Sequence, residues 1–148
     1  MAELRDSTWA HFACHAQIRL DDTSNSHLLL HDHPRNPLSV RHLAALCLPH
    51  AELAFLSACG TSLSSPGLMD EAVHITAAFQ LAGFAHVIGP LWTINDRAAV
   101  RTAREIYTRL LATPRTDIAW AVHGAVHSMR DRYRELPSLW ATHVHVGM

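Results

Sequence analysis

Two short apolar stretches decide the fold of this chain: His11-Phe12-Ala13-Cys14-His15 near its start and Phe55-Leu56-Ser57-Ala58-Cys59 in its middle. Each stretch ends in a reactive side chain, an imidazole at His15 and a thiol at Cys59. Apolar runs of this length are typical of buried parallel strands in α/β proteins, and ligands bind where such strands end. If the two strands are neighbours, an imidazole and a thiol meet at one sheet edge, which is the minimal apparatus of a cysteine hydrolase.

The chain around these stretches alternates predicted strands and helices. We expect strands over residues 9–14, 28–30, 52–58, 84–91 and 140–146, and helices over residues 40–47 and 69–82, the second ended by Gly83. Asn95 or Asp96 begins a further helix, and Thr116 begins another that ends at Pro137. The helix after Asn95 has an apolar face made of Ala99, Ala103, Ile106, Tyr107, Leu110 and Leu111. Strand–helix alternation predicts an α/β fold with a mainly parallel sheet and helices on both faces.

Composition excludes several classes of protein. The chain has 148 residues, 49% of them hydrophobic and 17% charged, which predicts one globular domain and not a disordered segment. The net charge of −1 gives no basic field for nucleic acid. No secretory signal is visible and no apolar run approaches the roughly 18 residues of a membrane span, so we expect no membrane association. Three cysteines without C-x-x-C spacing favour a reducing, cytoplasmic location.

The three cysteines differ in their sequence surroundings. Cys47 lies on the apolar stripe of its predicted helix and is interpreted as a small buried hydrophobe. Cys14 is adjacent to His15 on one strand, so their side chains point to opposite faces and a core role is expected for Cys14. Cys59 stands between an apolar strand and a loop rich in glycine and serine over residues 60–67, where a side chain is both held and exposed. Cys59 is therefore the candidate nucleophile.

These residues resemble the CHAT domain, a caspase-like peptidase family often joined to TPR repeats. The signature of that family is a strand reading roughly His-Phe-Ala-Cys-His-Gly, a leucine-rich strand and the sequence Leu-Ser-Ala-Cys. A helix ending Ala-Gly, a strand ending Leu-Trp, an acidic residue and a closing segment with Trp follow. The matching positions are residues 11–15, 28–30, 56–59, 82–83 and 91–92, with Asp96 and Trp140. They occur in the same order and span nearly the whole chain.

The resemblance implies a caspase-like three-layer sandwich and a cysteine endopeptidase without a cofactor or metal. By that resemblance His15 and Cys59 take the catalytic positions. Cys59 as thiolate attacks a peptide carbonyl, and His15 protonates the leaving amine. The backbone N–H groups of Cys59 and Ala16 stabilise the oxyanion. The substrate is then a protein or peptide, in a regulatory or defence system.

Three features depart from the family pattern. Ala16 stands where the family has Gly after the catalytic His, which matters if that position needs a left-handed backbone. Gly60 stands where the family tends to have Glu. The chain also opens directly on the His-bearing strand, so residues 1–148 are expected to be the C-terminal portion of a domain that lacks its N-terminal strands. A missing N-terminal portion, a sensor or a TPR-containing partner would cover the uncovered parallel edge.

Acidic residues are the candidates for substrate selection. Asp70, Glu71 and Asp96 could face the cleft and select a basic side chain on the substrate. The alternative is that Asp70 and Glu71 stabilise a helix N-terminus and Asp96 caps one.

The 13 histidines raise a further possibility. His31 with His33, and His143 with His145, each place two imidazoles on one side of an extended segment, but the four ligands of a structural zinc site are not present at recurring spacing. His11 is expected to face the core or to orient its neighbour. Two hypotheses stand beside the peptidase: a CHAT-like interaction module with weak or no catalysis, and an α/β metal-binding domain.

Overall fold

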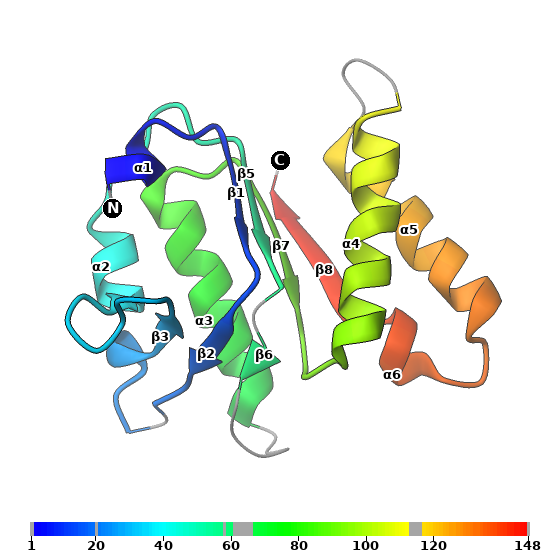
Figure 1. The fold of residues 1–148 in the computed structure, drawn as a ribbon, viewed down its shortest axis with the longest axis horizontal. Coiled ribbons are helices and arrows are strands. Elements are labelled where there is room, and N and C mark those ends of the chain that lie inside the picture. The colour runs from blue at the N-terminus through cyan, green and yellow to red at the C-terminus, as the bar shows by residue number, and fades with distance from the viewer. Residues whose placement is uncertain (1, 20, 58, 61–66, 113–116, 148) are drawn as a thin grey trace.

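The computed structural model describes residues 2–19, 21–57, 59–60, 67–112 and 117–147 (Figure 1). These residues form two four-stranded sheets with helices packed around them. In chain order the helices are α1 (Ala2–Arg5), α2 (Val40–Ala44), α3 (Gly67–Ala82), α4 (Asp96–Leu110), α5 (Ile118–Arg132) and α6 (Pro137–Trp140). The strands are β1 (Trp9–Phe12), β2 (His15–Gln17), β3 (His27–Leu29), β4 (Leu38–Ser39), β5 (Leu53–Leu56), β6 (Cys59–Gly60), β7 (His86–Pro90) and β8 (His143–Gly147).

The central sheet has the strand order β1-β5-β7-β8. Strands β1, β5 and β7 are parallel, and β8 pairs antiparallel with β7 at one edge. All four residues of β5 are buried because both faces of the sheet are covered. The predicted α/β architecture with a mainly parallel sheet is therefore confirmed.

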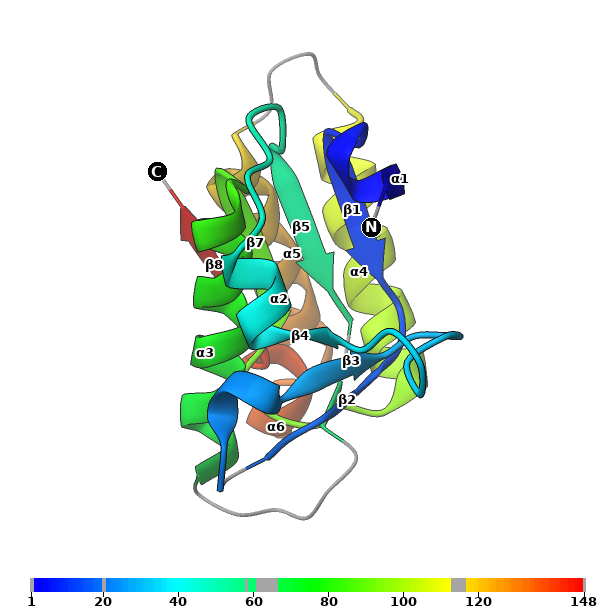
Figure 2. The ribbon, with the colours of Figure 1, turned by 90° about the vertical axis from the view of Figure 1, so that its left-hand side faces the viewer.

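Helices cover both faces of the central sheet, which makes three layers (Figure 1). Helices α2 and α3 lie on one face and α4 and α5 on the other, and the view turned by 90° shows the same separation (Figure 2). Phe12 and Phe79 pack together in the core under α3, with ring centroids 4.9 Å apart. Phe55 and Ile106 belong to the second core, under α4 and α5. Within the described residues, no helix has both the length and the apolar character needed to cross a bilayer.

A second, smaller sheet was not predicted. Its strand order is β4-β3-β2-β6, in which β2 pairs antiparallel with β3 and parallel with β6. The two predicted strands over residues 9–14 and 52–58 are each shorter than expected, because β1 ends at Phe12 and β5 ends at Leu56. Both chain segments then leave the central sheet and pair again in the smaller one, as β2 and β6.

The prediction for Cys47 was wrong. Helix α2 ends at Ala44, so the helical period that placed Cys47 on an apolar stripe does not extend to it. The Cys47 side chain is exposed, and Leu48 is the residue that is buried, at 2% exposure.

The helix boundaries confirm one predicted cap, correct another and correct one predicted helix end. The side chain of Asn95 accepts a hydrogen bond from the N–H of Ala98 and caps α4. Asp117, not Thr116, is the N-cap of α5, and Thr116 lies outside the described residues. Pro137 was expected to end that helix, but α5 ends at Arg132 and Pro137 opens α6, since a proline ring fits the first turn of a helix.

The prediction that Leu111 belongs to the apolar face of α4 was also wrong. Leu111 follows the last residue of the helix as its C-cap and is 75% exposed. Gly83 does follow α3 as predicted, with a positive φ of 121°.

Candidate active site

His15 and Cys59 are direct partners on neighbouring strands. Strand β2 pairs parallel with β6, and the register places His15 beside Cys59 and Ala16 beside Gly60. The same register holds upstream, where Phe12 pairs with Leu56 in the central sheet. Because equal numbers of residues separate Phe12 from His15 and Leu56 from Cys59, the two segments stay aligned as they pass between the sheets.

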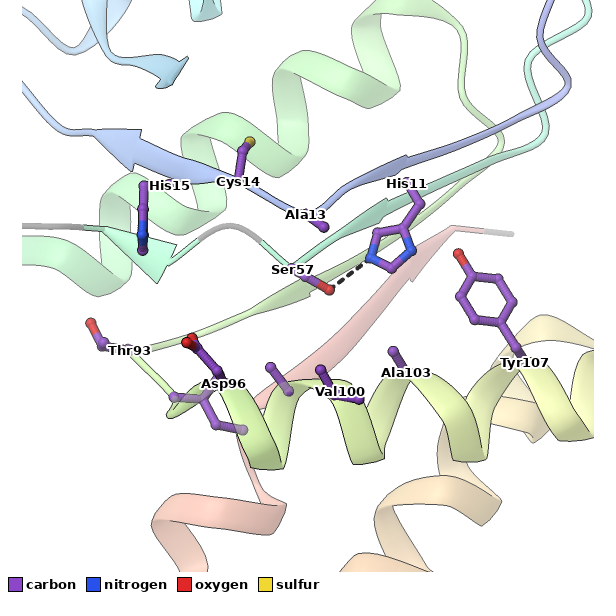
Figure 3. Close-up of a pocket in the computed structure, with 12 residues that line it drawn as sticks. His11, Ala13, Cys14, His15, Ser57, Thr93, Asp96, Val100, Ala103 and Tyr107 are labelled. Carbon is purple, nitrogen blue, oxygen red and sulfur yellow. Dashed lines mark hydrogen bonds between the residues drawn. The ribbon is translucent and has the colours of Figure 1, made fainter. Parts of the chain in front are cut away.

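A cavity of about 800 Å³ lies beside His15. In the close-up His15 points toward Thr93 and Asp96, across the opening from its strand (Figure 3). The cavity is bounded on one side by β1, β2 and the segment after β5, and on the other by α4 and the loop before it. Its lining residues are His11, Ala13, Cys14, His15, Ser57, Thr93, Ile94, Asp96, Ala99, Val100, Ala103 and Tyr107.

Cys14 has the orientation that the strand period predicted. Its side chain points away from the direction of His15 (Figure 3) and packs against the core under α3. Burial raises the pKa of the Cys14 thiol, which keeps it protonated and poorly nucleophilic at neutral pH. Cys14 contributes to the cavity wall but is not a partner of His15.

Helix α4 forms one long wall of the cavity. Asp96, Val100, Ala103 and Tyr107 recur at helical spacing and lie along it (Figure 3). The carboxylate of Asp96 lies at the His15 end, and Tyr107 lies at the end near His11. Between them the wall consists of small apolar side chains, which leaves room for a substrate side chain.

The other end of the cavity is an aromatic group built around His11. The His11 Nε2 is hydrogen-bonded to the Ser57 Oγ at 2.8 Å. The His11 ring stacks on Phe55 with centroids 4.7 Å apart and planes 8° apart, and Tyr107 lies at 5.6 Å. The His11 residue is exposed overall, but partial burial of its ring lowers its pKa below the usual value, so the neutral imidazole predominates at pH 7. The prediction that His11 faces the core or orients a neighbour did not identify Ser57 or Tyr107 as those neighbours.

The three acidic candidates have different outcomes. Asp96 lies in the first turn of α4 and lines the cavity, and it is not the cap of that helix. Asp70 and Glu71 fall in the first turns of α3, and their side chains lie outside the described part of the structure.

Ala16 occupies an ordinary strand position. It lies in the middle of β2 with its side chain 2% exposed, packed in the core under α3. The backbone there is extended, so the left-handed conformation that would have disfavoured alanine is not required.

The histidine pairs singled out in the sequence do not join into a metal-binding group within the described residues. His145 Nε2 lies 3.0 Å from His86 Nδ1, and His143 is buried. The described residues contain no group of three or more His, Cys, Asp or Glu side chains placed to hold a metal ion.

Comparison with known protein families identifies a match that covers the whole chain. The family model of the CHAT domain matches residues 1–148, the whole of the chain. A comparison with curated proteins finds no match. CHAT domains are related to the caspase-like cysteine peptidases, which agrees with the three-layer α/β architecture. The chain therefore belongs to the CHAT domain family.

Proposed function

We propose that this CHAT domain is a cysteine endopeptidase in which Cys59 is the nucleophile and His15 the general acid–base. The observation that carries the proposal is the pairing of β2 with β6, which aligns Cys59 with His15, a residue that lines the cavity. Neighbouring strands are about 4.8 Å apart, a distance that cysteine and histidine side chains can span. In the proposed role His15 stays accessible to a substrate, since its side chain is exposed.

The chemistry follows from the two groups. The Cys59 thiolate attacks the carbonyl carbon of the scissile peptide, and a C–S bond forms as the carbonyl oxygen takes up negative charge. His15 donates a proton to the leaving amine, the C–N bond breaks, and an acyl-enzyme remains. A water molecule then gives a proton to His15 and attacks the thioester, which releases the carboxylate product and the thiol. For the oxyanion we propose the backbone N–H groups of Cys59 and Ala16.

We propose that the substrate is a protein or peptide with a basic side chain next to the scissile bond. The support is the Asp96 carboxylate, which lines the same cavity as His15 and is directed toward it (Figure 3). The described residues that line the cavity include no lysine or arginine that would compete for the Asp96 carboxylate. Asp70 and Glu71 remain candidates for the same role. Replacing each of the three by alanine and profiling peptide cleavage tests this proposal. An unchanged preference for the substrate side chain would show that the replaced residue does not select it.

We also infer that cleavage serves a cytoplasmic regulatory or defence system and is controlled by a partner. Within the described residues β1 is an edge strand of the central sheet, with β5 on one side. An open parallel edge is a surface that proteins usually cover. A sensor, a TPR-containing partner or a further N-terminal portion is the proposed cover, and its presence should raise the reactivity of Cys59 toward a peptide probe.

The second candidate is a CHAT-like interaction module with weak or no catalysis. The observation that favours it is Gly60, which stands beside Ala16 where the family tends to have Glu. The exposed apolar surface of Val100, 61% exposed in the cavity wall, would then bind a peptide without cleaving it.

An electrophilic peptide probe separates the two functions. Wild-type protein should be labelled at Cys59, and both Cys59→Ala and His15→Ala should abolish or strongly slow the labelling. Cys47→Ala, which removes an exposed thiol away from the pair, is the matched control and should be labelled at the wild-type rate. Failure of a panel of probes to label wild type would favour the interaction module, and labelling that survives Cys59→Ala would refute this nucleophile.

A further inference from the structure

The hydrogen-bond ladder between the two reactive segments is interrupted just before His15 and Cys59. The ladder of β1 with β5 ends at Phe12 and Leu56, and that of β2 with β6 begins at His15 and Cys59. Two contacts span this gap: the Ser57 N–H donates to the Phe12 carbonyl at 3.0 Å, and the Ser57 Oγ is hydrogen-bonded to His11 Nε2 at 2.8 Å. Ser57 is thus held from both its backbone and its side chain, two residues before Cys59.

The His11 ring is itself fixed in orientation. It lies nearly parallel to Phe55, its partner in the strand register, and Tyr107 of α4 lies against it on another side. A ring that is stacked on one face and hydrogen-bonded at one nitrogen has little freedom to rotate. The hydrogen bond from His11 therefore fixes the side chain of Ser57 relative to β1 and β5.

We propose that His11 is a positioning residue, whose hydrogen bond to Ser57 fixes the backbone that delivers Cys59 opposite His15. The bond does no chemistry on a substrate. It holds Cys59 and Gly60 in the register that the two-residue strand β6 is too short to hold alone. The effect on peptide cleavage rests on the proposed function, whereas the effect on the backbone does not.

The neutral state of His11 suits this role. Burial lowers its pKa, so at pH 7 the ring carries one proton and shares a single hydrogen with the Ser57 hydroxyl. A side chain that offers a hydrogen-bonding group at the Nε2 position, such as glutamine, should replace it in part.

Backbone amide hydrogen exchange tests the proposal without any need for catalysis. Ser57→Ala and His11→Ala should each raise the exchange rate of the amides at positions 57, 59 and 60 by about fivefold, as expected for the loss of one net hydrogen bond. His11→Gln should restore most of the protection. The matched control is Glu52→Ala, which removes the Trp9 Nε1 to Glu52 Oε2 bond of 2.9 Å between the same two chain segments at the other end of the ladder. That control should leave positions 57, 59 and 60 unchanged.

Labelling of Cys59 measures the consequence for the site. Ser57→Ala and His11→Ala should slow labelling by a peptide probe about tenfold or more, because a misplaced nucleophile loses its alignment with the bound carbonyl. The double variant should be no slower than the worse single variant, since both remove one interaction. Losses that multiply in the double variant, or exchange rates that stay at the wild-type values, would overturn the proposal. If wild type is never labelled but the exchange rates rise as stated, positioning stands and the peptidase function fails.

Discussion

Acid should destabilise this domain through one buried histidine, His143. His143 is the first residue of β8 and is 5% exposed. Its ring lies edge-on to that of Phe55, with the two ring centroids 6.0 Å apart. Its Nδ1 lies 3.1 Å from the Thr142 hydroxyl, while its Nε2 has no hydrogen-bond partner among the described residues. Burial without a counter-charge lowers the pKa of His143 to about 4.

The size of the effect follows from proton linkage. In the unfolded chain the imidazole takes up its proton near pH 6.5, but in the folded protein it does so only near pH 4. Between these values the unfolded state binds more protons, so the free energy of unfolding falls as the pH falls. The loss is about 3 kcal/mol by the folded pKa near pH 4, and it is complete only below that pH, where the folded protein is protonated too. This is a large share of the roughly 5–15 kcal/mol that stabilise a small domain.

Urea denaturation followed by circular dichroism between pH 7 and pH 4 measures this loss. The comparison is between wild type and His143→Gln, because other side chains titrate in the same range in both proteins. His143→Gln should be less stable at pH 7, and its stability should fall by about 3 kcal/mol less than that of wild type over the interval. His123→Gln, at an exposed position of α5, should follow the wild-type curve. Parallel curves for wild type and His143→Gln would refute the reasoning.

Two further predictions concern Gly83 and the free thiols. Gly83→Ala should lower the free energy of unfolding by about 1–3 kcal/mol in the same denaturation assay, because φ is 121° and an added Cβ would lie 2.5 Å from the Leu48 carbonyl oxygen; an unchanged midpoint would contradict this. In native protein treated with iodoacetamide, mass spectrometry should find Cys47 modified well before Cys14, since Cys47 is exposed while burial raises the pKa of Cys14. Equal rates at the two thiols would show that Cys14 is not held in the core.

The pairing of the reactive segments was predictable because each is an apolar run that ends in a polar group. Such runs become adjacent buried strands in an α/β fold, as β1 and β5 are. His15 and Cys59 do not close these strands as expected but open β2 and β6, where they are again partners. The opposite directions of Cys14 and His15 were also predicted from the two-residue period of a strand, although Cys14 lies between β1 and β2 and not within either. These inferences need only local pattern and the rules of parallel sheets.

The smaller sheet and the aromatic end of the cavity were not predictable in the same way. Nothing in the apolar run over residues 9–14 marks Phe12 as the last residue of one sheet, because the break depends on which partner each half finds. Helical spacing correctly put Ala103 and Tyr107 on one face of α4, but spacing does not tell whether that face meets a core or a cavity. The prediction that Cys47 is buried was wrong for a related reason, since the helical period was extended past the end of α2.

The cavity wall on α4 and the strands that carry His15 and Cys59 come from separate stretches of the chain. Under the proposed function, α4 selects the peptide while β2 and β6 cut it. Mutations at exposed positions of α4, such as Val100, can then change which peptide substrates bind without altering β2 and β6. Such a division lets a lineage diversify its targets rapidly, and it makes α4 the element to randomise when a new cleavage preference is sought.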